Sequence, residues 1–97
     1  MLSLRQEILT ILRERSLTLK ELGQTLGLRE KDVADHLAHA ARSLAEGEEL
    51  CEHPAECLAC GFPFQGRRRL STPGRCPRCR SERIRPASFR VHTRTGG

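Results

Sequence analysis

Two cysteine pairs organise the second half of this chain: Cys57-Leu58-Ala59-Cys60-Gly61 and Cys76-Pro77-Arg78-Cys79. Fifteen residues separate the two C-x-x-C motifs. Two residues between thiolates let one tight turn present both sulfurs to the same ion, and two such turns complete a tetrahedral S4 shell. The four cysteines are therefore the predicted ligands of one structural Zn²⁺ ion: Cys57, Cys60, Cys76 and Cys79. Iron is a chemical alternative in an S4 site.

The competing roles of paired cysteines are disulfides and redox dithiols. No apolar run approaches the roughly 20 residues of a membrane span, and residues 1–7 are charged and amphipathic, unlike a signal peptide. We therefore expect a cytoplasmic protein, in which disulfides are rare. A redox C-x-x-C would need a βαβ context, which this sequence does not show. Four thiolates leave no ligand position for a catalytic water, and no nucleophile and base can be paired, so we predict no enzyme activity.

The turns of the two motifs differ in one respect. Gly61 permits the backbone reversal after the first pair, whereas Arg80 stands where a glycine would be more comfortable. The chain has 97 residues, no Trp or Tyr and three Phe. Because zinc binding can supply roughly 10–16 kcal/mol, more than this aromatic-poor half would gain from its own core, we expect residues 57–79 to fold only with metal.

The first half has a helical pattern. Two capping boxes, in which a Ser or Thr and a Gln or Glu three residues later bond to each other's backbone, are present: Ser3 with Gln6, and Thr18 with Glu21. They predict helices over about 4–15 and 19–26, and Gly27 suits a left-handed helix end. A third helix is predicted from Glu30 to about Ala45, although Arg29 is a poor N-cap, and Gly47 ends it.

A short helix, a turn and a longer helix make helix-turn-helix topology. Leu50–His53 alternates like a strand, and the stretch ending at Val91 would return antiparallel to it with Phe89 and Val91 facing the helices. Pro54 and Pro86 limit this ladder.

This arrangement resembles a family of prokaryotic transcription regulators with a winged helix fused to a rubredoxin-like zinc ribbon. The resemblance covers roughly residues 4–91, and its specific part is the position of the cysteine pairs after the third helix. The resemblance rests on the following segments: Leu26-Gly27-Leu28, the helix from Glu30 to Leu44, and residues 54–62, 75–82 and 89–91. It implies an α+β fold: a three-helix winged helix-turn-helix of residues 1–56 plus 83–97, with a small β hairpin or wing carrying the zinc ribbon of residues 57–82.

Charge divides the chain. Residues 1–50 hold seven Lys or Arg and nine Asp or Glu, and residues 51–97 hold ten Arg and three Glu, so the net charge of +5 comes from the second half. Basic residues of the third helix and of the ribbon are the candidate contacts to duplex DNA: Arg29, Lys31, Arg42, Arg67, Arg68, Arg69, Arg78 and Arg80. The acids Glu30, Asp32 and Asp35 on the same helix would be repelled by phosphates.

The prediction is thus a zinc-stabilised, non-catalytic DNA-binding transcription regulator. The alternative is a protein–protein adaptor on the same scaffold. The odd cysteine, Cys51, is expected to be a half-buried thiol, and His36 and His39 to belong to a solvated polar face. No long heptad repeat offers a dimer interface, so the sequence leaves the oligomeric state open.

Overall fold

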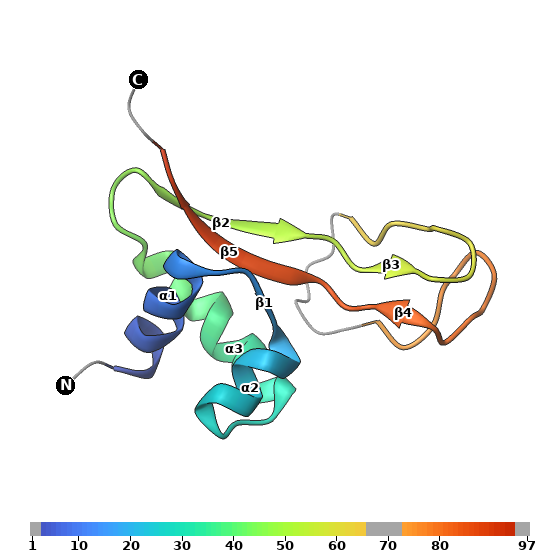
Figure 1. The fold of residues 1–97 in the computed structure, drawn as a ribbon, viewed down its shortest axis with the longest axis horizontal. Coiled ribbons are helices and arrows are strands. Elements are labelled where there is room, and N and C mark those ends of the chain that lie inside the picture. Colours follow the sequence, from blue (N-terminus) through green and yellow to red (C-terminus); the bar gives the residue numbers. More distant parts are fainter. Residues whose placement is uncertain (1–2, 66–72, 95–97) are drawn as a thin grey trace.

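The computed structural model describes residues 3–65 and 73–94 and shows a mixed α+β fold, as predicted. Three helices form one end of the molecule, and two long strands lead from them to a small ribbon at the other end (Figure 1). The elements in chain order are α1 (Leu4–Glu14), β1 (Leu17–Thr18), α2 (Leu19–Leu26), α3 (Glu30–Ala40), the 3-10 turn η1 (Ala41–Ser43), β2 (Glu48–His53), β3 (Glu56–Cys57), β4 (Ile84–Arg85) and β5 (Ser88–Thr93).

The first two helices begin at the predicted caps. The Gln6 amide donates to Ser3 Oγ over 3.2 Å, and the Glu21 amide donates to Thr18 Oγ1 over the same distance. Both reciprocal bonds of each capping box are present. Gly27 ends α2 in the left-handed conformation, with φ of 71°. Local side-chain chemistry therefore fixes both helix starts and the turn before α3.

The third helix starts where predicted but ends earlier. Arg29 is its N-cap and makes no side-chain capping bond. The prediction that the helix continues to about Ala45 is wrong, because α3 ends at Ala40 and the chain makes one 3-10 turn before Leu44 becomes extended. The Ala45 amide donates to the carboxylate of Glu48, and the Glu48 amide donates to the Ala45 carbonyl, both over 3.0 Å. Because of these two hydrogen bonds, Ala45 belongs to a turn and not to the helix.

The strand β5 is the centre of a three-stranded antiparallel sheet with the order β1-β5-β2. Leu50 lies opposite Val91 and Leu17 lies opposite Phe89. The antiparallel return to β2 is as predicted, and β1 adds a third strand that the sequence analysis did not include. In the ribbon, β3 pairs with β4 and places Cys57 opposite Ile84.

The core lies between the helices and the inner face of this sheet. Phe89 is fully buried and Val91 is 3% exposed, so the prediction that β5 turns these residues to the helices is confirmed. The buried residues of the helical part are Ile8, Leu9, Leu12, Leu17, Leu19, Leu22, Val33, Leu37 and Ala40. Within the described ranges, none of the helices has the length and apolar composition needed to cross a bilayer.

Candidate metal centre

The cysteines lie in two turns with the same backbone hydrogen bonds. In the first turn, the Gly61 amide donates to the Cys57 carbonyl over 2.8 Å, and the Cys57 amide donates to the Phe62 carbonyl over 2.9 Å. The second turn repeats both bonds, from Arg80 to Cys76 over 2.8 Å and from Cys76 to Ser81 over 2.9 Å. We call these turns the first knuckle (residues 57–62) and the second knuckle (residues 76–81).

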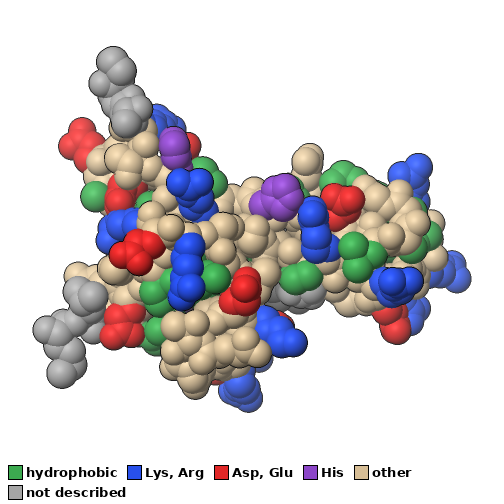
Figure 2. All heavy atoms as spheres, in the orientation of Figure 1, with side chains coloured by type: hydrophobic (Ala, Val, Ile, Leu, Met, Phe, Trp, Pro, Cys, Tyr) green, Lys and Arg blue, Asp and Glu red, His purple; other side chains and the backbone are tan. Residues whose placement is uncertain are grey.

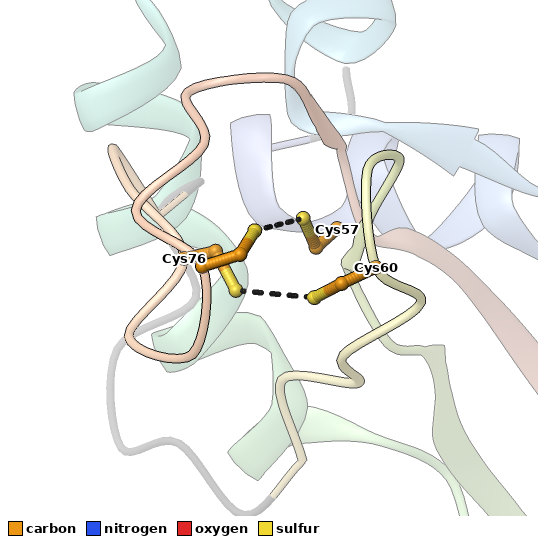
Figure 3. Close-up of side chains that lie close together, drawn as sticks. Cys57, Cys60 and Cys76 are labelled. Atoms are coloured by element: carbon orange, nitrogen blue, oxygen red, sulfur yellow. Dashed lines mark hydrogen bonds between the residues drawn. The ribbon is translucent and has the colours of Figure 1, made fainter.

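The two knuckles face each other and bring their sulfur atoms together. All four cysteine sulfurs lie within 4.8 Å of one another. Cys57 Sγ is 3.5 Å from Cys79 Sγ, and Cys60 Sγ is 3.7 Å from Cys76 Sγ, each across the gap between the knuckles. Figure 3 shows Cys57 and Cys60 directed from one loop toward the second. The pairing of β3 with β4 anchors the start of this arrangement, because Cys57 is itself a residue of β3.

Each knuckle has a left-handed residue at its next-to-last position. Gly61 has φ of 77°, which costs a glycine little. Arg80 occupies the matching position with φ of 64°, and it is the non-glycine residue with positive φ in the part of the chain that the structure describes. This position was predicted to suit glycine, and its left-handed backbone confirms that prediction.

Hydrogen bonding divides the thiols into two kinds. Burial of Cys57 opposes its ionisation, but the amides of Cys60 and Ala59 and the Cys79 thiol outweigh burial and lower its pKa to about 6. For Cys60, the Phe62 amide favours the thiolate, while burial and the neighbouring thiols together raise the pKa to about 12. The second knuckle repeats the pattern, with the pKa of Cys76 lowered and that of Cys79 raised. The first cysteine of each knuckle is thus held toward the thiolate form, which is the form that binds metal.

The donor set fits a structural zinc ion. Four sulfurs in a compact cluster match the S4 coordination that Zn²⁺ accepts, and amide groups directed at the sulfurs disperse the charge that four thiolates bring. The Arg78 amide, for example, lies 3.3 Å from Cys76 Sγ. The four cysteines are therefore positioned to bind a metal, as the spacing of the motifs predicts. The amides of the knuckles were not identified from the sequence, because backbone donors have no residue-type signal.

The remaining cysteine and the helical histidines lie apart from this cluster. Cys51 lies on β2, opposite Arg90, and is half-buried, as predicted. His39 is exposed, and its Nδ1 lies 2.8 Å from the Asp35 carbonyl. In the described ranges, neither His39 nor His36 belongs to a metal-binding group.

The candidate DNA contacts fall in two separate places. Arg29, Lys31 and Arg42 are exposed on or beside α3, where Arg29 pairs with Asp32 at 3.3 Å. Arg78 and Arg80 are exposed on the second knuckle. Three further candidates lie outside the described residues: Arg67, Arg68 and Arg69.

Arg85 links the ribbon to the three-stranded sheet, which the sequence analysis did not foresee. Its Nη2 lies 3.1 Å from His53 Nε2 at the end of β2 and 3.1 Å from the Glu56 carboxylate on β3. These partners are 32 and 29 residues distant in the chain, so the sequence around Arg85 could not predict the contact.

Comparison with known proteins agrees with this architecture. Residues 3–51 match the family described as PF0610-like, N-terminal, and residues 54–94 match the PF0610 rubredoxin-like zinc beta-ribbon domain. The solution NMR structure of protein PF0610 from Pyrococcus furiosus is 30% identical, with a TM-score of 0.72 over 93% of this chain and 89% of that one. No curated protein shows significant similarity. The chain therefore belongs to the PF0610 family, with its N-terminal domain followed by a rubredoxin-like zinc ribbon.

Proposed function

We propose that this chain is a zinc-stabilised, non-catalytic regulator of transcription that binds duplex DNA in the cytoplasm. In this proposal residues 1–56 and 83–97 form a winged helix, and the zinc ribbon of residues 57–82 is inserted at the wing. The observation that carries the proposal is the close packing of α2 and α3 around a short turn, where the Leu28 amide donates to the Gly23 carbonyl over 2.9 Å. Such a unit leaves the outer face of its second helix free for the major groove.

The outer face of α3 offers cations for this contact. Val33, Leu37 and Ala40 face the core, whereas Lys31 and Arg42 are exposed. Among the described residues, no carboxylate lies within ion-pairing distance of Lys31 or Arg42. Both cations are therefore available to phosphates or to the acceptor edge of guanine.

The ribbon carries an excess of positive charge, because residues 57–82 hold six Arg and one Glu. On the face drawn in Figure 2, arginine side chains outnumber acidic ones at the ribbon end, while both signs of charge mix over the helices. Arg75 pairs with Glu82 at 3.5 Å and Arg85 pairs with Glu56 at 3.1 Å. Three more basic side chains in or directly after the ribbon are exposed and have no such partner among the described residues: Arg78, Arg80 and Arg83. This surface favours phosphate binding that weakens with salt.

A paired set of variants tests the role of α3. The double variant Lys31→Ala with Arg42→Ala should weaken binding to a random duplex, measured by fluorescence anisotropy on zinc-loaded protein. The control, Arg5→Ala with Arg15→Ala, removes the same charge from exposed positions at the two ends of α1. Equal affinity of the two double variants would remove α3 from the interface and leave only a general charge effect.

The acidic residues of α3 favour a second candidate, a protein–protein adaptor. Glu30 and Asp35 are exposed on the same helix, and the first half of the chain is acidic overall. Phosphates would repel these carboxylates, whereas a basic protein surface would attract them. Absence of DNA binding at low salt, together with co-purification of one defined protein partner that Glu30→Gln with Asp35→Asn releases, would support the adaptor.

A further inference from the structure

The two knuckles are near-copies of each other except at one position. Each closes with an amide-to-carbonyl bond of 2.8 Å and a second bond of 2.9 Å, and each has a positive φ at its last turn. The first knuckle places Gly61 there, and the second places Arg80. The left-handed conformation is unfavourable for a residue with a Cβ atom, so Arg80 is the less stable of the two solutions.

Among the residues that the structure describes, the side chain of Arg80 has no partner that would offset this disadvantage. Arg80 is exposed, and within residues 3–65 and 73–94 no ion pair or side-chain hydrogen bond involves its guanidinium. Only its backbone is used, through the amide bond to the Cys76 carbonyl. A glycine would make that bond equally well, so the knuckle itself does not require an arginine.

Arg80 is also accompanied by other unpaired cations. Arg78 is two residues earlier in the same knuckle, and Arg83 is three residues later; both are exposed. The Leu58 amide donates to the Arg83 carbonyl over 2.8 Å, which holds Arg83 beside the first knuckle. Arginines without carboxylate partners, one of them at a strained backbone position, indicate a surface kept for an anionic ligand.

We infer that Arg80 contacts a phosphate of duplex DNA irrespective of the base sequence. Its presence at this left-handed position lowers the stability of the second knuckle. This inference rests on the proposed function and refines it, because it assigns a contact to one ribbon residue. A structural residue should lose stability when it is replaced. Replacing Arg80 should instead weaken DNA binding while leaving the stability of the fold unchanged or raising it.

The test compares Arg80→Gly, Arg80→Lys and Arg5→Ala in the zinc-loaded full chain. Arg5 lies on α1 and serves as the control for loss of one positive charge. Binding to a random-sequence duplex is measured by anisotropy over a range of salt, alongside zinc content and the thermal midpoint. Arg80→Gly should retain its zinc, melt at or above the wild-type temperature, bind several-fold more weakly, and lose about one unit from the slope of log K against log salt.

Arg80→Lys should keep most of the affinity, because it retains the charge at the same backbone position. Equal binding by Arg80→Gly and Arg5→Ala would overturn the inference while leaving DNA binding itself intact. A lower melting temperature or reduced zinc content in Arg80→Gly would also overturn it, by showing a structural role. If the wild-type chain binds polyglutamate but not DNA, both the inference and the proposed function fail, and the surface belongs to an acidic protein.

Discussion

Arg13 and Glu48 join the last turn of α1 to the first residue of β2, with Nε 2.7 Å from Oε2 and Nη2 2.9 Å from Oε1. The same carboxylate accepts the Ala45 amide over 3.0 Å. Glu48 therefore closes the turn after α3 and ties that turn to α1. Its side chain is only 10% exposed, so this two-pronged pair is shielded more than an ordinary surface ion pair.

Replacing Glu48 with Gln should lower the melting temperature, with a loss that depends on pH. Hydrogen bonding from Arg13, and then from the Ala45 amide, lowers the pKa of Glu48 below its ordinary value. A lowered carboxyl pKa stabilises the fold fully above the unfolded-state pKa of about 4.3, and this contribution is lost as pH falls through the folded-state pKa. The difference in melting temperature between wild type and E48Q should be largest at pH 7 and should shrink as the pH falls below about 4.

Glu46→Gln is the matched control, since Glu46 is exposed in the same turn. It should leave the melting temperature nearly unchanged at both pH values. A difference for E48Q that stays constant with pH would show that the ion pair does not stabilise the turn.

Gly23→Ala should destabilise the chain although alanine is the better helix former. A Cβ atom on Gly23 would lie 2.5 Å from the carbonyl oxygen of Leu28, which is backbone and cannot move freely. Overpacking of this kind costs about 1–3 kcal/mol, against a gain of up to about 1 kcal/mol in helix propensity. Chemical denaturation measures the difference, with Gln24→Ala as the exposed control in the same helix. Equal stability of the two variants would mean that the Leu28 carbonyl leaves room for a Cβ atom at position 23 and would contradict this prediction.

Removal of one metal ligand should unfold the ribbon and spare the helices. Cys60→Ser breaks the sulfur cluster, and zinc binding supplies roughly 10–16 kcal/mol that the ribbon then lacks. Ribbon amides should collapse toward random-coil positions in the NMR spectrum, while the helical circular dichroism signal persists. Cys51→Ser, which changes a half-buried cysteine outside the cluster, should preserve both signals. A fully unaffected amide spectrum in Cys60→Ser would refute the metal-site assignment.

The number of thiols that react with a thiol reagent, with and without zinc, should give the number of cysteine ligands. The chain has five cysteines, four of which form the cluster. In the zinc-loaded protein, only Cys51 should react with a thiol reagent under native conditions, because the metal holds the other sulfurs as bound thiolates. After chelation of zinc, all five should react. Two or more rapidly reacting thiols in the loaded protein would contradict a closed S4 site.

Sequence reasoning succeeded where the cause is local. The capping boxes at Ser3 and Thr18, the left-handed Gly27 and the spacing of the cysteine pairs each depend on residues within a few positions of one another. The unusual backbone of Arg80 was foreseen for the same reason, by comparison with Gly61.

It failed where distant segments decide the structure. The two-residue strand β1 has no periodicity of its own, and it exists because Leu17 pairs with Phe89. The early end of α3 depends on the Glu48 carboxylate, whose position is set in turn by Arg13. A helical pattern that continues to Ala45 gives no sign of either contact.

DNA binding is tested by measuring the affinity of the zinc-loaded wild-type chain for a random duplex at about 50 and about 200 mM salt. Zinc content is checked beforehand at one ion per chain. If about six of the candidate basic residues contact phosphates, binding should weaken roughly a thousandfold between the two conditions, with a slope near −5. Absence of binding at the lower salt concentration, from protein with full zinc content, would contradict the proposed function and direct the search to a protein partner.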